Sequence, residues 1–117
     1  MLDVIFRGVL LRLAPGLKVD KVLALASQTD ELNGLASLFP KAGLTVVEPS
    51  EAMLQGLKRQ VHLPQAEYLN SRFEEAVLPS AYQICSCLLV LQFVENPSLF
   101  LRKIYDSLSE GGLLILS

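Results

Sequence analysis

The chain has 117 residues, of which 51% are hydrophobic and 19% charged, and its formal net charge is −2. This length suits one domain with one core. The basic pairs Lys58-Arg59 and Arg102-Lys103 are isolated, which argues against the clustered basic face of a nucleic-acid-binding protein. The longest apolar stretch, residues 84–94, is too short to span a bilayer, so no membrane association is expected.

Apolar residues recur at helical spacing at the start of the chain, at Leu2, Ile5, Phe6, Val9 and Leu13. This spacing predicts an amphipathic helix over residues 1–16, ended by Pro15-Gly16.

Strands and helices are expected to alternate through the rest of the chain, residues 19–117. Short apolar runs predict five strands, at residues 21–26, 44–48, 67–70, 82–89 and 113–116. Helices are expected after the first, second and fourth of these, with Ser50 and Asn96 as N-caps and Gly111 ending the last helix. Such alternation predicts a parallel sheet with helices on both faces, so residues 1–117 form a single α/β domain.

Cys85 and Cys87 lie two residues apart in a predicted strand, where both side chains point to one face. A disulfide between them does not suit extended geometry, so they are expected to be buried free thiols in a reducing compartment. The predicted location is therefore cytoplasmic. The single histidine, His62, is expected on the surface, and neither a catalytic acid–base pair nor a metal site is predicted.

Three segments carry a resemblance to a known family: residues 46–54 (VVEPSEAML), 91–97 (LQFVENP) and 108–115 (LSEGGLLI). With these motifs in this order, Lys21 to Ser117 resembles the class I S-adenosylmethionine (SAM) dependent methyltransferases. The resemblance implies a three-layer α/β/α Rossmann-like fold with parallel strands in the order 3-2-1-4-5. It also implies that the antiparallel pair that follows the fifth strand in the family is absent here.

In this family an acidic residue at the end of the second strand binds the ribose hydroxyls of SAM. Glu48 stands there, about 20 residues past the first loop, the spacing of the same role in a related nucleotide-binding fold. A carboxylate suits a vicinal diol because it offers two acceptor oxygens. Glu48 is therefore predicted to contact the ribose; the alternative is a strand-end acid that faces only water.

The first loop departs from the family pattern Asp-Leu-x-x-Gly-x-Gly and its variants. Residues 24–30 (ALASQTD) align with it, and Ala26, Gln28 and Asp30 stand at the three positions where the pattern or its variants have glycine. A side chain with a Cβ resists positive φ and holds a ligand away from the backbone. Asp30 would also repel the methionine carboxylate of SAM. A simpler interpretation is that Thr29 or Asp30 caps the helix that follows. We expect Ala26 and Gln28 to line a site that binds SAM weakly or not at all.

Three further residues complete the predicted cofactor site. Arg72 stands after the third strand, where the family often has an acid that reads the adenine amine. Phe73 either stacks on the adenine or belongs to the core. Leu89 ends the predicted fourth strand, whose usual initial Asp is Gln83 here.

The predicted fifth strand would be an unpaired apolar edge made of Leu113, Leu114, Ile115 and Leu116. We expect this edge to pair with another chain, in a homodimer or in a complex with a complete methyltransferase. The alternative is a truncated chain.

Two functions are compatible with these observations. The glycine-free loop, Arg72 and the open edge favour a degenerate, non-catalytic methyltransferase-like module that binds a protein partner. The motif order and Glu48 favour an active SAM-dependent methyltransferase acting on a small molecule or a protein. We prefer the first, and the sequence alone does not decide whether the chain is an enzyme.

Overall fold

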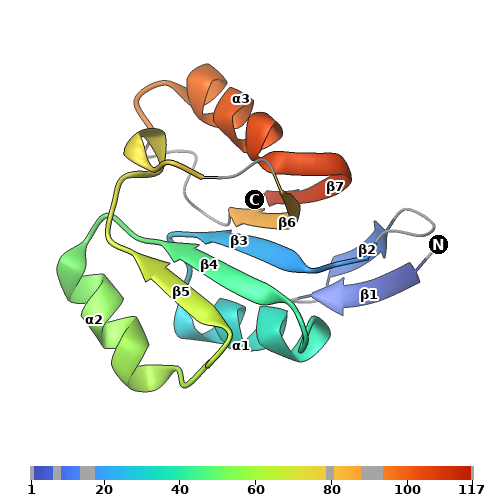
Figure 1. The fold of residues 1–117 in the computed structure, drawn as a ribbon, viewed down its shortest axis with the longest axis horizontal. Coiled ribbons are helices and arrows are strands. Elements are labelled where there is room, and N and C mark those ends of the chain that lie inside the picture. The colour runs from blue at the N-terminus through green and yellow to red at the C-terminus, as the bar shows by residue number, and fades with distance from the viewer. Residues whose placement is uncertain (1, 7–8, 14–17, 79–80, 88–93, 117) are drawn as a thin grey trace.

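The computed structural model describes residues 2–6, 9–13, 18–78, 81–87 and 94–116. Five parallel strands form the main sheet: β3 (Lys21–Leu25), β4 (Gly43–Val47), β5 (Ala66–Leu69), β6 (Tyr82–Cys87) and β7 (Leu108–Leu116). They lie in the order β5-β4-β3-β6-β7, which is the predicted order 3-2-1-4-5 counted within this sheet (Figure 1). The predicted α/β Rossmann-like architecture is therefore confirmed.

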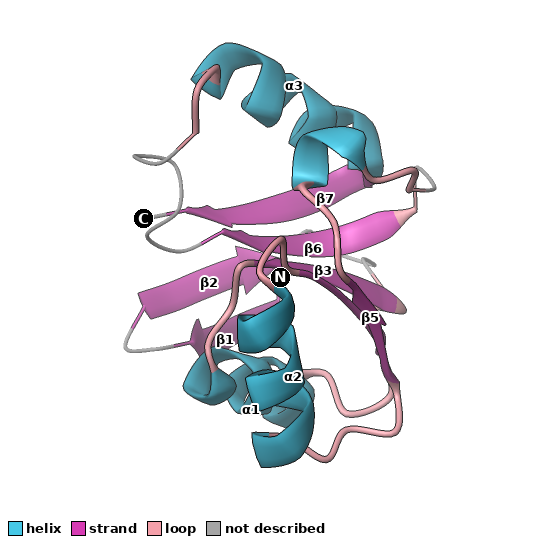
Figure 2. Cartoon of the chain, turned by 90° about the vertical axis from the view of Figure 1, so that its left-hand side faces the viewer, coloured by secondary structure: helices cyan, strands magenta, loops and turns pink. Residues whose placement is uncertain are grey.

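Helices cover both faces of this sheet. Helices α1 (Thr29–Leu38) and α2 (Glu51–Gln60) lie on one face, and α3 (Pro97–Ser107) lies on the other, together with the short 3-10 helix η1 (Phe73–Glu75) (Figures 1 and 2). None of the helices in the described part of the chain is long and apolar enough to cross a membrane.

Two helix starts follow the capping residues that the sequence contains. The hydroxyl of Ser50 accepts a hydrogen bond from the backbone N–H of Met53 at 3.3 Å and begins α2. The Oδ1 atom of Asn96 accepts from the N–H of Leu99 at 3.2 Å, and Pro97 takes the first helical position of α3. Both caps were predicted, because each satisfies an N–H that the first helical turn leaves without a partner.

The N-terminal prediction is wrong. Instead of a helix, β1 (Leu2–Phe6) and β2 (Val9–Leu13) form a separate antiparallel pair, with Leu2 opposite Leu13 and Phe6 opposite Val9. Each run is only five residues long, and so short an apolar run fits a helical period and an extended strand equally well. The pair lies at the right of Figure 1, where the strands of the main sheet begin.

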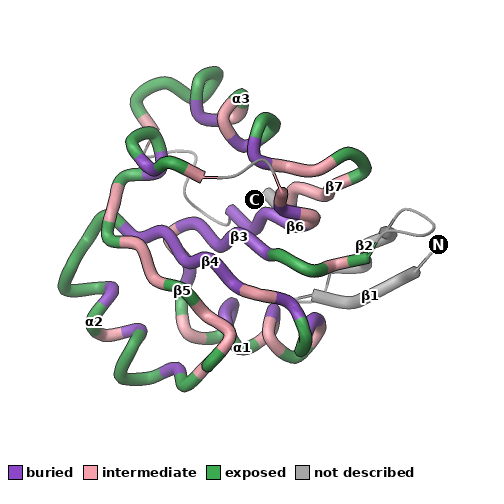
Figure 3. The backbone as a smooth tube through the Cα atoms, viewed as in Figure 1, coloured by how far each residue is buried: buried purple, intermediate pink, exposed green. Residues whose placement is uncertain are grey.

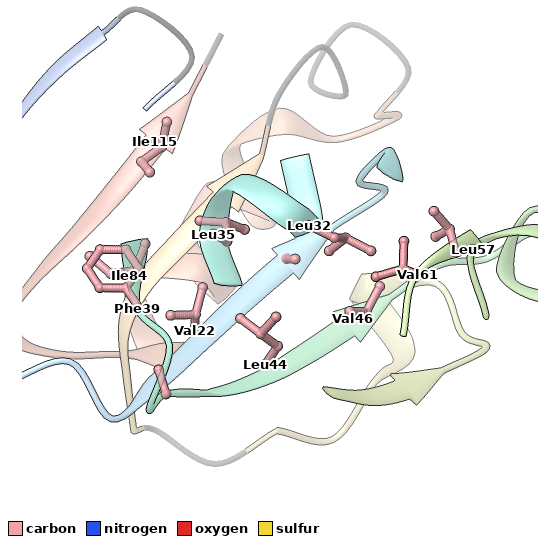
Figure 4. Packing of buried hydrophobic residues seen from close by; sticks show 12 residues of the cluster. Val22, Leu32, Leu35, Phe39, Leu44, Val46, Leu57, Val61, Ile84 and Ile115 are labelled. Carbon is pink, nitrogen blue, oxygen red and sulfur yellow. The ribbon is translucent and has the colours of Figure 1, made fainter. Parts of the chain in front are cut away.

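The core has two layers, one on each face of the sheet. Side chains of β3 alternate between them: Val22 and Ala24 pack into the layer under α1 and α2, whereas Leu23 and Leu25 pack into the layer under α3. Figure 3 shows the buried residues concentrated in β3, β4 and β6, the centre of the sheet. Figure 4 shows the first layer, where Leu32 and Leu35 of α1 lie over β3 and β4.

Gly111 does not end α3 as predicted. The helix ends at Ser107, and Gly111, with φ 76°, lies in an irregular stretch of β7 where its pairing with β6 shifts between Tyr82 and Ile84. The next residue, Gly112, is packed so closely that an added Cβ would lie 2.9 Å from the carbonyl oxygen of Ser109. The glycine pair therefore serves the strand bulge rather than the helix cap.

Gln83 joins the first residues of β3 to β6 at the amino end of the sheet. Its Oε1 atom accepts hydrogen bonds from the backbone N–H groups of Asp20 and Lys21, both at 2.8 Å. Its Nε2 atom donates to the carbonyl oxygen of Ala81 at 3.0 Å. The side chain that replaces the family Asp is thus a structural bridge far from the carboxyl ends of the strands.

The two thiols behave as the sequence predicted. Cys85 and Cys87 are buried and free. Burial is the main cause that raises the pKa of both thiols, in the case of Cys87 to about 11. At neutral pH both are therefore protonated, apolar core groups.

Candidate functional site

A cleft of about 490 Å³ lies at the carboxyl ends of β3 and β4. The chain runs outward from β3 to β5 in one direction and from β6 to β7 in the other, so the strand order reverses between β3 and β6. In open α/β sheets ligands bind at such a switch point, beyond the carboxyl ends of the strands. The volume of the cleft is within the range usual for small-molecule sites.

The structure brings most of the predicted cofactor residues together. Ala26, Gln28, Glu48, Arg72 and Phe73 all line this cleft, although they come from three separate segments of the chain. The remaining predicted residue, Leu89, lies outside the described residues.

The loop between β3 and α1 contains no glycine, but one of its residues has the backbone conformation that glycine usually adopts. Ala26 has φ 49°, and it is the one non-glycine residue with positive φ in the described part of the chain. Its N–H donates to the carbonyl oxygen of Val47 at 3.0 Å, which fixes the loop against β4. Two positions later, Gln28 has an ordinary φ of −98° and an exposed side chain. The backbone thus turns at residue 26 as a glycine would.

The start of α1 differs from the prediction. Gln28, rather than Thr29 or Asp30, is the N-cap, and its side chain makes no capping hydrogen bond. The first turn of α1 therefore faces the cleft region without a side-chain cap from residue 28. Asp30 is exposed and does not line the cleft, so the expected repulsion from this carboxylate has no support in the geometry.

Glu48 is buried at the end of β4, with only 6% of its surface exposed. Its N–H donates to the carbonyl oxygen of Leu69, and its own carbonyl accepts from Nδ2 of Asn70, both at 3.0 Å. The Oε2 atom accepts from the N–H of Ser50 at 2.8 Å. These contacts fix the carboxylate at the cleft wall, so Glu48 is not a strand-end acid that faces only water.

Arg72 and Phe73 line the cleft from the segment that follows β5. Phe73 is buried and packs edge-to-face on Phe100, with ring centroids 5.1 Å apart and an interplanar angle of 71°. The interpretation of Phe73 as a core residue is therefore confirmed, and the same side chain also lines the cleft. Arg72 is exposed and pairs with Glu74, with 3.0 Å between Nη2 and Oε2.

Comparison with known proteins shows which family this chain belongs to. A sequence model of the family described as "Methyltransferase domain" matches residues 27–116, most of the chain. The chain belongs to the methyltransferase domain family. The predicted resemblance to SAM-dependent methyltransferases is thereby confirmed, and the matched range contains Gln28, Glu48, Arg72 and Phe73.

Relatives of this methyltransferase domain are longer proteins. It is 28% identical over 81 residues to the mitochondrial ubiquinone biosynthesis O-methyltransferase of Schizosaccharomyces pombe, a match that covers 65% of this chain and 30% of the relative. It is 25% identical over 83 residues to the malonyl-[acyl-carrier protein] O-methyltransferase of Bacillus cytotoxicus, covering 71% and 29%. The chain thus spans less than a third of these relatives.

Solved structures support the same fold. The plantazolicin methyltransferase BpumL, in complex with SAH, superimposes with a TM-score of 0.74 at 17% identity, covering 84% of this chain and 38% of that protein. A putative S-adenosylmethionine dependent methyltransferase from Listeria monocytogenes gives a TM-score of 0.74 at 23% identity, covering 89% and 49%. At these identities the likeness establishes the fold of the methyltransferase domain.

The sequence-based site missed Glu31. This residue lies in the first turn of α1, is only 5% exposed and lines the cleft of the methyltransferase domain. Its negative charge adds to the burial that raises the pKa of Cys87 in β6. The signal was present, because Glu31 precedes the buried Leu35 by four residues and so shares its helix face.

The residues of the cleft suit an adenosyl ligand. The backbone at Ala26 already has the positive φ that the glycine position requires, and a methyl group is the smallest side chain that could replace a glycine there. Glu48 presents a fixed carboxylate, and apart from the Ser50 bond the described residues make no further hydrogen bond to that group. An acceptor therefore remains for a ligand hydroxyl.

Proposed function

We propose that this chain is the cofactor-binding part of a SAM-dependent methyltransferase, and that the cleft holds SAM. The observation that carries the proposal is the buried carboxylate of Glu48 beside the positive-φ turn at Ala26, at the switch point of the sheet. Family membership supports the same conclusion.

Each wall of the cleft has its own role in this proposal. Glu48 accepts hydrogen bonds from the ribose hydroxyls through the carboxylate oxygen that Ser50 leaves available. The small side chain of Ala26 lets the methionine portion approach the backbone. Phe73 and Leu25 provide apolar surface for the adenine ring.

When bound, SAM supplies an activated methyl group on a sulfonium. Methyl transfer of this kind depends mainly on holding the two reactants in line and on excluding water. The contribution of this chain is therefore to position the cofactor, and the absence of a predicted acid–base pair is compatible with it. The chain spans less than a third of its relatives, and the role that we propose for it is confined to the cofactor.

A second candidate is the non-catalytic module that the sequence favoured. One observation supports it: the side chain of Gln28 lines the cleft at a position where the family has a glycine. In this candidate the cleft binds SAM weakly or not at all, and the chain acts by binding a protein partner.

Isothermal titration calorimetry with SAM separates the two candidates. We expect dissociation constants in the micromolar range for the chain, since the ribose acceptor and the loop turn are both in place. The absence of detectable heat at high micromolar concentrations of a folded protein would overturn the proposed function in favour of the module.

The partner in the second candidate would pair along the edge of β7, through the backbone of Leu113 to Leu116. β7 is an edge strand of the described sheet, and an apolar edge with unpaired backbone groups is a template for another strand. We expect a dimer in multi-angle light scattering. A monodisperse monomer at high concentration would contradict pairing between copies of this chain.

A further inference from the structure

The cleft carries an excess of negative charge. Among the described residues, four acidic residues line it, namely Glu31, Glu48, Glu74 and Glu95, against one basic residue, Arg72. Arg72 is already within 3.0 Å of Glu74, and both side chains are substantially exposed. The formal charge of the lining is therefore negative, and its two buried members are Glu31 and Glu48.

The two buried carboxylates differ in what they face. Glu48 is held by the N–H of Ser50 at the end of β4, where the ribose is expected. Glu31 lies in the first turn of α1, next to the loop that contains Ala26. It is only 5% exposed and lines the cleft together with Leu25 and Ala26 at the carboxyl end of β3.

Charge is what distinguishes the methyl donor from its demethylated product. Both carry the same adenosine and the same zwitterionic amino-acid group, but SAM has a positively charged sulfonium where the product has a neutral thioether. A carboxylate in a partly buried site interacts with such a charge far more strongly than it would in water. A ligand with a central positive charge therefore complements this cleft better than a neutral one.

We infer that the cleft selects SAM over the demethylated product, and that Glu31 is the residue that determines this preference. The inference rests on the proposed function and adds a specificity to it. Glu31 is a specificity determinant in this role because its charge complements the sulfonium, whereas Glu48 recognises a ribose that both ligands share.

The test compares three ligands by calorimetry: SAM, S-adenosylhomocysteine, and an analogue in which a C–NH3+ group replaces the sulfonium. We expect the unmodified chain to bind SAM and the cationic analogue about tenfold more tightly than S-adenosylhomocysteine. Glu31→Gln should weaken SAM binding by about five- to tenfold and leave S-adenosylhomocysteine binding unchanged. The matched control is Glu51→Gln, which removes the same charge from an exposed position outside the cleft.

Three outcomes would overturn the inference. Equal affinity of the unmodified chain for SAM and S-adenosylhomocysteine would do so without any variant, even if Glu31→Gln failed to fold. Equal weakening of both ligands by Glu31→Gln would show a structural role for the side chain. If neither ligand binds the folded chain, the proposed function itself fails, and the charge preference fails with it.

Discussion

Replacing Glu48 with alanine is expected to weaken SAM binding by at least about 100-fold. In the proposed site this carboxylate, at the end of β4, accepts hydrogen bonds from the ribose, and hydrogen bonds to a charged acceptor contribute about 1.5–3 kcal/mol each. Losing such a bond and the negative charge together corresponds to about 3 kcal/mol or more. Calorimetric titration of the variant with SAM measures this loss.

Two comparisons distinguish loss of the ribose contact from loss of the fold. Glu51→Ala removes an exposed carboxylate three residues further along the chain and should leave SAM affinity within about twofold. Glu48→Gln keeps one acceptor oxygen and should give an intermediate affinity. The assignment of Glu48 to the ribose would be wrong if the folded Glu48→Ala protein bound SAM within about threefold of the unmodified chain.

Glycine at position 26 is expected to stabilise the domain and tighten SAM binding, and valine is expected to do the opposite. An L-residue in the left-handed region costs about 1–2 kcal/mol, of which glycine relieves most. Glycine also raises the conformational entropy of the unfolded chain, which lowers stability by about 0.4–1 kcal/mol. Ala26→Gly should therefore raise the free energy of unfolding by about 0.5–1 kcal/mol in total. Denaturant titration measures this difference in the free energy of unfolding.

The valine variant has the larger effect. A β-branched side chain is a strong outlier at positive φ, so Ala26→Val should lower the free energy of unfolding by about 2 kcal/mol and fill the cleft beside the loop. SAM binding by this variant should fall below detection. Ala52→Gly is the matched control, because Ala52 lies in α2 at ordinary helical φ, where glycine destabilises by about 1 kcal/mol. A destabilising effect of Ala26→Gly would contradict the strain that we assign to this turn.

The fold was largely predictable because its strands carry unambiguous patterns. Short apolar runs separated by helical segments admit few arrangements other than a parallel sheet covered on both faces. The first 16 residues carry no such constraint, since short, mostly apolar runs of five residues are compatible with both a helical and an extended period. These residues form strands because Leu2–Phe6 pairs with Val9–Leu13, and the local sequence pattern does not reveal that pairing.

The prediction of the site succeeded for residues whose position follows from spacing along the chain. It failed for residues whose position depends on which side of a helix faces the cleft. Glu48 follows β4 directly, so the end of the strand places it at the cleft. Asp30 and Glu31 are adjacent in the first turn of α1, and about 100° of rotation separates them. Asp30 entered the predicted site because it aligns with a family glycine, and such an alignment does not say which way each side chain of the following helix points; the structure places Glu31 in the cleft and leaves Asp30 exposed.

The bridge made by Gln83 has a mechanical consequence for the whole domain. Because it fastens the starts of β3 and β6, the two strands that flank the switch point cannot spread apart at their roots. The floor of the cleft therefore rests on strands whose spacing this bridge fixes, and adaptation to an arriving ligand is expected in the loop between Leu25 and α1.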